Sequence, residues 1–240
     1  YYDHIGGGID TVSGFGKITI LGNSYTGRGI WYYYIVSLLF KTPISYFLFL
    51  LLSLFYLVKN TSLSLFIKNH FFLIIPVLYF LVILSFFYQT QCGIRHIIFI
   101  YPFFFILSGS VIANAKFLFQ KALVFFASIF LIISVMKYYN NYYPYTNELI
   151  EDKTTANEYV GASNLNFGHG NLFYKKYMRE HKDVKWVTER PEVGIFLITV
   201  DDYMDIWNKH QYDWITSFKP IGHVAHSALL IRVTEKDIEK

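Results

Sequence analysis

The chain contains no aspartate or glutamate between Asp10 and Glu148, and phenylalanine, leucine and isoleucine dominate the same stretch. Carboxylates are costly in hydrocarbon, so a long apolar stretch without acids is typical of a membrane region. The acids are gathered elsewhere. Residues 1–140 hold two acids and nine lysines or arginines, whereas residues 141–240 hold fifteen acids and twelve bases. We therefore expect two parts that meet near residue 140.

The composition excludes several common classes of protein. Apolar residues make up 54% of the chain and charged residues 16%, against about 25% charged residues in a soluble domain. An ordinary soluble domain and a disordered chain are both inconsistent with these values. The positive net charge comes from the acid-poor part, so it does not indicate a nucleic-acid partner. Cys92, the single cysteine, excludes an internal disulfide and a CxxC metal pair. We expect no cofactor, and the sequence gives no support for a divalent metal.

Apolar segments of nearly membrane-spanning length recur along the first part. A hydrocarbon core about 30 Å thick needs about 20 apolar residues per helix. Lys41-Thr42-Pro43 interrupts the first run, and proline suits the first turn of a helix. We therefore expect an interfacial helix at 31–40, followed by spans at 43–58, 71–88, 97–115 and 122–139. The alternative to this split is one long helix that is kinked at Pro43.

Lysines in the connections between the spans predict the orientation in the membrane. The connections at 59–70 and 115–121 carry two lysines each, whereas the connection at 89–96 carries one arginine. The positive-inside rule then puts the two lysine-bearing connections in the cytoplasm. The expected parts are an extracytoplasmic loop at 1–30, a transmembrane helical region at 31–140 and an extracytoplasmic domain at 141–240.

Strand and helix patterns alternate after residue 140, which is typical of a small α/β domain. Val193–Val200 is an apolar run bounded by proline and by Asp201-Asp202, and it predicts a strand. One of these aspartates is expected to cap a helix that reaches about Lys209. The other expected elements are a strand at 157–163, a helix at 171–181 and strands at 184–187 and 228–233. The expected fold is a polytopic α-helical membrane domain with about four spanning helices, followed by a small α/β domain.

Arg95-His96 is the most informative polar pair in the apolar part, because it stands at the mouth of the third span. The planar guanidinium matches phosphate oxygens, so Arg95 is a candidate to hold a lipid-linked phosphate, with His96 beside it. Lys41 is a second candidate for the same phosphate. Trp31 and Tyr33 belong to an aromatic run that is suited to line a groove for a sugar or a lipid. Each also has a simpler interpretation, since interfacial arginines snorkel and aromatic side chains anchor helices.

Four short motifs follow one another along almost the whole chain. They are Leu21-Gly22 with Gly29-Ile30-Trp31-Tyr32-Tyr33-Tyr34 and Lys41-Thr42-Pro43; Gly93-Ile94-Arg95-His96 with Tyr101-Pro102; Asn147-Glu148-Leu149 with Ser163-Asn164-Leu165-Asn166-Phe167-Gly168; and Trp214 with Lys219-Pro220-Ile221-Gly222-His223 and His226-Ser227. In this series the chain resembles the carboxyl-terminal half of family 39-like GT-C membrane glycosyltransferases, relatives of the protein O-mannosyltransferases and aminoarabinose transferases. It departs from the family pattern at Phe99, Asn166, Phe167 and His169, where proline, aspartate, tryptophan and glutamine are common.

The resemblance implies an inverting multi-pass membrane enzyme that moves a sugar from a polyprenyl-phosphate carrier to an acceptor on the extracytoplasmic face. Membrane lipid, the lipid-phosphate sugar and that acceptor would be its partners. Arg95, helped by His96 and Lys41, would neutralise the carrier phosphate as it leaves. The family's catalytic carboxylate lies in the first external loop, and nothing in this chain matches that loop. We therefore expect the acid upstream, and the 240 residues alone to be inactive.

The alternative is a non-catalytic polytopic membrane module, such as a transporter half or a scaffold whose carboxyl-terminal domain binds a partner. The two hypotheses differ in geometry. In an enzyme that holds a lipid phosphate, Lys41, Arg95 and His96 must face one cavity near the polar domain. In a module they need not converge.

Overall fold

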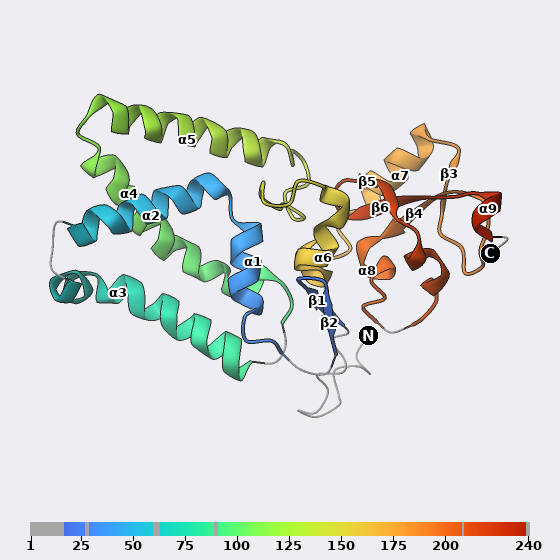
Figure 1. Cartoon of the computed structure of the whole chain (residues 1–240), viewed down its shortest axis with the longest axis horizontal. Coiled ribbons are helices and arrows are strands. Elements are labelled where there is room, and N and C mark those ends of the chain that lie inside the picture. The colour runs from blue at the N-terminus through green and yellow to red at the C-terminus, as the bar shows by residue number, and fades with distance from the viewer. Residues whose placement is uncertain (1–16, 27–28, 60–62, 89–90, 208, 239–240) are drawn as a thin grey trace.

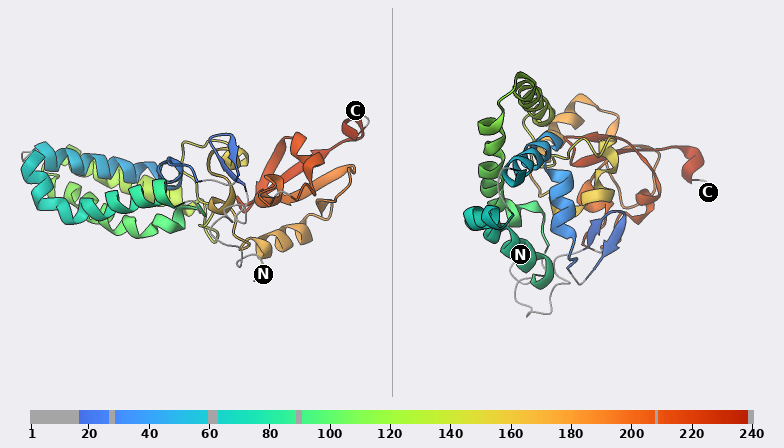
Figure 2. Two further views of the ribbon diagram at one scale, coloured as in Figure 1. Left: turned by 90° about the horizontal axis from the view of Figure 1, so that it is seen from below. Right: turned by 60° about the vertical axis from the view of Figure 1, so that its left-hand side comes forward.

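The computed structural model describes residues 17–26, 29–59, 63–88, 91–207 and 209–238. More than half of the loop expected at 1–30 therefore lies outside the described residues. The described chain is elongated, with long helices at one end and a small sheet at the other (Figure 1, Figure 2). Near the junction, β1 (Ile18–Ile20) and β2 (Asn23–Tyr25) form an antiparallel hairpin.

The helical part supplies three helices that are long and apolar enough to cross a membrane, counted over the described residues. They are Lys68–Phe87, Ile94–Val111 and Leu118–Met136. The elements follow the order α1 (Tyr33–Lys41), α2 (Ile44–Lys59), α3 (Leu63–Val82), the π-helix η2 (Ile83–Phe87), the 3₁₀ helix η3 (Ile94–Ile100), α4 (Tyr101–Asn114) and α5 (Leu118–Met136). The bent pair of α1 and α2 makes a fourth candidate if it is one span. The sequence predicts about four spanning helices. The described residues contain three, or four if α1 and α2 together form one span.

These helices leave large apolar side chains that no other part of the described chain covers. On α5, Phe125, Phe126 and Ile132 are each more than half exposed. A soluble protein rarely exposes so much apolar surface, whereas lipid tails cover it. Some polar groups turn inward instead. The Ser53 hydroxyl on α2 donates to the Ser108 carbonyl on α4 at 2.9 Å, as is common between helices in lipid. The helical part is therefore suited to associate with a membrane.

The first apolar run bends sharply where Pro43 interrupts it. The axes of α1 and α2 differ by 108°. Proline has no N–H and a fixed φ, so it suits the start of α2 and opposes continuation of α1. The structure therefore has the two expected helices, and a single kinked helix is wrong. Because of the bend, α1 leaves the layer of long helices and lies beside the polar part (Figure 1).

The polar part is built around a mixed four-stranded sheet. Its strands run in the order β3-β4-β6-β5, with β3 and β4 parallel and the other pairs antiparallel. The elements are the 3₁₀ helix η4 (Lys153–Thr155), α6 (Ala156–Val160), the 3₁₀ helix η5 (Ala162–Asn164), α7 (Asn171–Glu180), β3 (Val184–Trp186), β4 (Gly194–Thr199), α8 (Val200–Tyr203), the 3₁₀ helix η6 (Asp213–Ser217), β5 (Pro220–Val224), β6 (Ala228–Val233) and α9 (Glu235–Ile238). The arrangement is compatible with the expected small α/β domain.

The prediction of a strand at 157–163 was wrong. The segment forms α6 and part of η5. Ala156 and Val160 stand four residues apart, so they lie on one face of α6, and both are buried in the core. A segment this short does not carry enough periodicity to distinguish a strand from one helical turn.

Two further predictions near the sheet need correction. The helix expected after the strand at 193–200 ends at Tyr203, well before Lys209. Its cap is Thr199, whose hydroxyl accepts a hydrogen bond from the Asp202 amide at 3.1 Å, so neither aspartate is the cap. Strand β5 was not predicted, because its proline and glycine weaken the strand signal.

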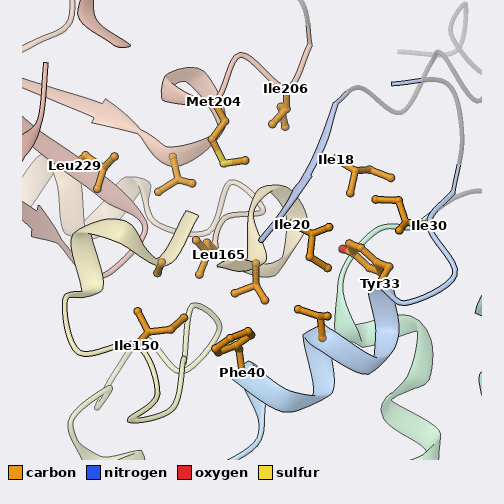
Figure 3. Packing of buried hydrophobic residues seen from close by; sticks show 14 of the residues in the cluster. Ile18, Ile20, Ile30, Tyr33, Phe40, Ile150, Leu165, Met204, Ile206 and Leu229 are labelled. Atoms are coloured by element: carbon orange, nitrogen blue, oxygen red, sulfur yellow. The ribbon is translucent and has the colours of Figure 1, made fainter. Parts of the chain in front are cut away.

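The hydrophobic core crosses the boundary that the charge pattern indicated near residue 140. Tyr33 and Phe40 of α1 lie in one buried cluster with Ile20 of β1, Leu165 and Met204 (Figure 3). The same cluster continues into β4 and β6. Helix α1 therefore serves as a shared core element, joined to the polar part by packing and to α2 by two residues of chain.

Asparagine side chains from the polar part fasten α1 in place. The Asn147 amide donates to the Leu39 carbonyl, and to the Thr42 carbonyl at 2.7 Å. The last carbonyls of a helix have no partner within the helix, so Asn147 satisfies groups that burial would otherwise leave unpaired. The side-chain amide nitrogen of Asn164 donates to the Tyr33 hydroxyl at 3.1 Å. The side-chain oxygen of Asn164 accepts a hydrogen bond from the Ile94 backbone amide at 2.9 Å.

We predict that Asn164→Ala destabilises the protein through its effect on this junction. The substitution leaves the partly buried Ile94 amide without its acceptor, which costs about 2 kcal/mol of unfolding free energy. For a chain of this size the thermal midpoint should fall by about 4–8 °C. Thermal unfolding in neutral detergent measures the shift. Asn23→Ala removes an exposed asparagine bond and is the matched control, expected to change the midpoint little. An equal shift in both variants contradicts the prediction.

Candidate functional site

The candidate site forms where the start of η3 meets the loop that follows η5. Gly93, two residues before Arg95, adopts a φ of 83°. A Cβ atom at this position would stand 2.8 Å from the Ser163 carbonyl oxygen. Only glycine combines this backbone conformation with so close an approach. The Gly93 amide donates to the Tyr33 hydroxyl at 2.9 Å, so α1 also positions the turn that presents Arg95.

Arg95 faces the polar part and is covered by an aromatic ring. Its guanidinium carbon lies 3.8 Å from the centre of the Phe167 ring, a geometry that stabilises the cation through the ring face. Arginine keeps its charge at any physiological pH. Among the described residues, no carboxylate forms an ion pair with Arg95. A positive charge therefore stands at the end of an apolar helix, with no anion paired to it in the part of the chain that the structure describes.

Tyr143 is the residue on which the site converges. Its hydroxyl donates to the Ser163 carbonyl at 2.5 Å, and its ring lies 4.6 Å from the ring of His169. The Lys41 ammonium lies 5.7 Å from the same ring. Burial raises the pKa of Tyr143, and the nearby Arg95 guanidinium partly offsets this rise. The phenol is therefore held neutral between two basic side chains.

His169 places an unpaired polar group beside this tyrosine. Both of its ring nitrogens are buried and have no hydrogen-bond partner in the described part of the chain. Burial lowers the pKa of His169, and Lys41 adds to the effect. The imidazole is therefore neutral at pH 7, with one nitrogen that can donate and one that can accept.

Lys41 is placed close to Tyr143 but is occupied by backbone groups. Its side chain is buried, and the ammonium donates to the Tyr143 carbonyl at 2.7 Å and to the Asn164 carbonyl at 2.6 Å. Two of its three donors are therefore used to hold loops of the polar part against the end of α1. The geometry favours a positioning role for Lys41 over direct contact with a substrate.

The other predicted site residues lie around this centre without converging on it. Tyr33 is buried, and its hydroxyl supports Gly93 and Asn164. The His96 ring lies 6.0 Å from the ring of Tyr88. Trp31 is 55% exposed and stacks on Phe86. The structure therefore brings Arg95 and Lys41 to one tyrosine, while His96 and Trp31 contact other rings.

Asp201, which the sequence suggested as a candidate helix cap, adds a partly buried carboxyl. Its Oδ2 accepts a hydrogen bond from the Asn166 amide at 2.8 Å, and its Oδ1 is buried without a partner among the described residues. Burial raises the pKa of Asp201 to about 7. A carboxyl with this pKa can hold or release a proton near neutral pH.

Histidines and acids in the polar part form one group with the spacing of a metal site. His210 Nδ1 lies 2.8 Å from an Asp213 oxygen and 3.6 Å from an Asp205 oxygen, and no other such group occurs in the described residues. His210 and Asp213 are exposed, and the three side chains already pair with one another. The centres of the His223 and His226 rings lie 4.2 Å apart at a tilt of 33°, and no third ligand joins them among the described residues. Neither arrangement assigns a metal, and the absence of a cofactor stays a prediction.

Comparison with known proteins leaves the family open. No protein-family model, no curated protein and no solved structure matches the chain. The function must therefore be inferred from the residues and the geometry described above.

We predict that Asp201→Asn reduces the loss of stability that accompanies a rise in pH. The folded-state pKa of about 7 lies above the value of about 3.9 in an unfolded chain. Between these values the folded protein keeps a proton that the unfolded chain releases, so stability falls as pH rises, by up to about 1.4 kcal/mol per unit. Thermal midpoints at pH 5 and pH 8 measure the effect.

The variant should be more stable than wild type at pH 8 and should show a smaller difference between the two pH values. Asparagine can still accept the hydrogen bond from Asn166. Asp183→Asn removes an exposed carboxyl and is the matched control, expected to keep the wild-type pH dependence. A pH dependence in Asp201→Asn identical to wild type contradicts the assignment.

Proposed function

We propose that this protein is a membrane glycosyltransferase that uses a polyprenyl-phosphate sugar as donor. The observation that carries the proposal is Arg95, a permanent cation at the end of an apolar helix with no carboxylate paired to it among the described residues. A phosphate at the membrane surface is the anion that matches a planar guanidinium in this position. The resemblance of the four motifs to family 39-like enzymes supports the same donor class.

In this proposal Arg95 holds the carrier phosphate and stabilises the charge that develops on it as the sugar leaves. The Phe167 ring covers the guanidinium from one side, with the guanidinium carbon 3.8 Å from the ring centre. Tyr143 and His169 supply neutral hydrogen-bonding groups beside the cation. Lys41 keeps the two loops together. A carboxylate outside the described residues would deprotonate the acceptor hydroxyl.

The proposal includes a multi-pass orientation in which Arg95 and the polar part lie on the extracytoplasmic side. Positive-inside counting supports this orientation, because the lysine-bearing connections lie at the opposite ends of the spans. In the structure, α5 ends on the side of the polar part (Figure 1). The donor sugar and the acceptor would then meet between the helix ends and the sheet.

We predict that Arg95→Ala abolishes most of the binding of a polyprenyl phosphate, and most sugar transfer in membranes where this chain is part of a full-length enzyme that also supplies the catalytic carboxylate. Loss of a charged hydrogen-bonding partner for phosphate costs about 2 kcal/mol or more, which is at least about thirtyfold in affinity. Arg95→Lys keeps the charge but loses the fork and the contact with Phe167, so it should recover only part of the binding. Binding of a radiolabelled polyprenyl phosphate measures both variants.

Arg232→Ala is the matched control, because it removes an exposed arginine on β6. It should bind and transfer as wild type does. Wild-type transfer by Arg95→Ala contradicts the proposal and favours the non-catalytic module. A folded Arg95→Ala variant that binds the lipid normally but does not transfer would place Arg95 in a later step and contradict the phosphate contact.

A further inference from the structure

A pocket of about 260 Å³ lies between the end of α5 and one face of α7. Lys137 and Tyr139 line it from the residues that follow α5, and Lys176 and Tyr177 line it from α7. His226, in the turn between β5 and β6, completes one wall. Helices α5 and α7 both lie along the upper side of the molecule in Figure 1. None of the residues that line this pocket belongs to the site around Arg95.

The length of α5 places this pocket at the level of lipid headgroups. Helix α5 has 19 residues, which at about 1.5 Å per residue is about 28 Å. This length matches a hydrocarbon core of about 30 Å. If α5 spans the bilayer, Met136 marks the edge of the hydrocarbon, and Lys137 and Tyr139 enter the headgroup layer. Lysine and tyrosine are the residue types expected at this boundary.

The charge of the pocket is positive. Lys137 and Lys176 are both exposed, and among the described residues neither forms an ion pair. Glu180 is the one carboxylate among the lining residues. Burial lowers the pKa of His226 to about 4, so this ring is neutral at pH 7. Its Nδ1 is buried and has no partner in the described part of the chain. Two cations, a polar wall and tyrosine rings therefore surround the pocket.

We propose that this pocket binds the headgroup of an anionic phospholipid, with the phosphate held by the ammonium groups of Lys137 and Lys176. The volume lies just below the range of about 300–1,000 Å³ for sites that take a small molecule, so a headgroup fits while the acyl chains lie along α5. Juxtamembrane lysines are attracted to anionic lipid, and the tyrosine rings suit the boundary between chain and headgroup. Bound in this way, the lipid ties α7 to the membrane surface.

Titration of the purified protein in neutral detergent with dioctanoyl phosphatidylglycerol, followed by native mass spectrometry, tests the proposal. Lys137→Gln with Lys176→Gln should weaken binding about thirtyfold, since each lysine near the surface contributes about one factor of five in affinity. Lys121→Gln with Lys175→Gln is the matched control, because it removes the same amount of charge from α5 and α7 at positions outside the pocket. The control should bind as wild type does.

A further variant guards against loss of folding as an explanation. Glu180→Gln removes the one rim carboxylate and should tighten phosphatidylglycerol binding severalfold, which an unfolded protein cannot do. Dioctanoyl phosphatidylcholine and inorganic phosphate should both bind at least tenfold more weakly than phosphatidylglycerol. Equal weakening by both double variants overturns the proposal. Equal binding of phosphatidylcholine also overturns it, and inorganic phosphate that binds as tightly as the lipid would mark a free-phosphate site instead.

The result is independent of the glycosyltransferase proposal. Arg95→Ala should leave phosphatidylglycerol binding to the pocket unchanged, whereas Lys137→Gln with Lys176→Gln should leave the binding of a polyprenyl phosphate at Arg95 unchanged. Failure of one proposal is therefore distinguishable from failure of the other.

Discussion

The rest of the structure depends on the buried ammonium group of Lys41. Its two hydrogen bonds to the Tyr143 and Asn164 carbonyls join the end of a helix to two loops that follow it by more than a hundred residues. Because the group is shielded from water, loss of either acceptor would leave a polar group unpaired at a substantial cost. Asn147 acts in the same way, because its side-chain amide donates to the Leu39 and Thr42 carbonyls at the same end of α1. These contacts make the layer of long helices and the sheet one structural unit, and they set the position of Arg95.

Much of the fold follows from local patterns in the sequence. The apolar runs predict the long helices, Pro43 predicts the break between α1 and α2, and the apolar segments of β4 and β6 predict the centre of the sheet. The failures are short elements. Helix α6 has only five residues, with Ala156 and Val160 as its buried apolar side chains, and β5 carries a proline and a glycine, so neither has enough periodicity to identify its type. The shared core around Tyr33 was hidden for another reason, since hydropathy does not distinguish burial in protein from burial in lipid.

The site was only partly predictable. Arg95 could be identified as a candidate from the sequence, because a single charge within an apolar stretch is energetically costly and commonly marks a functional site. Tyr143, His169 and Asp201 were missed as a group, because their proximity comes from loops that are distant in sequence. Asn166 stands where the family that the motifs resemble commonly has aspartate, which suggested that a carboxyl is missing at this position. In the structure Asn166 is hydrogen-bonded to Asp201, so a neighbouring segment supplies a carboxyl beside it.

The bend of 108° between α1 and α2 gives bilayer thickness a route to the polar part if α2 lies in a membrane. Helices in membranes adjust their tilt when the thickness of the hydrocarbon changes. Helix α1 continues into α2 after two residues, and hydrogen bonds of Lys41, Asn147 and Asn164 hold α1 to the polar part. A change in the tilt of an embedded α2 would therefore pull on α1 and on the Gly93 turn that the Tyr33 hydroxyl holds. The position of Arg95, two residues after Gly93, would then depend on the thickness of the bilayer.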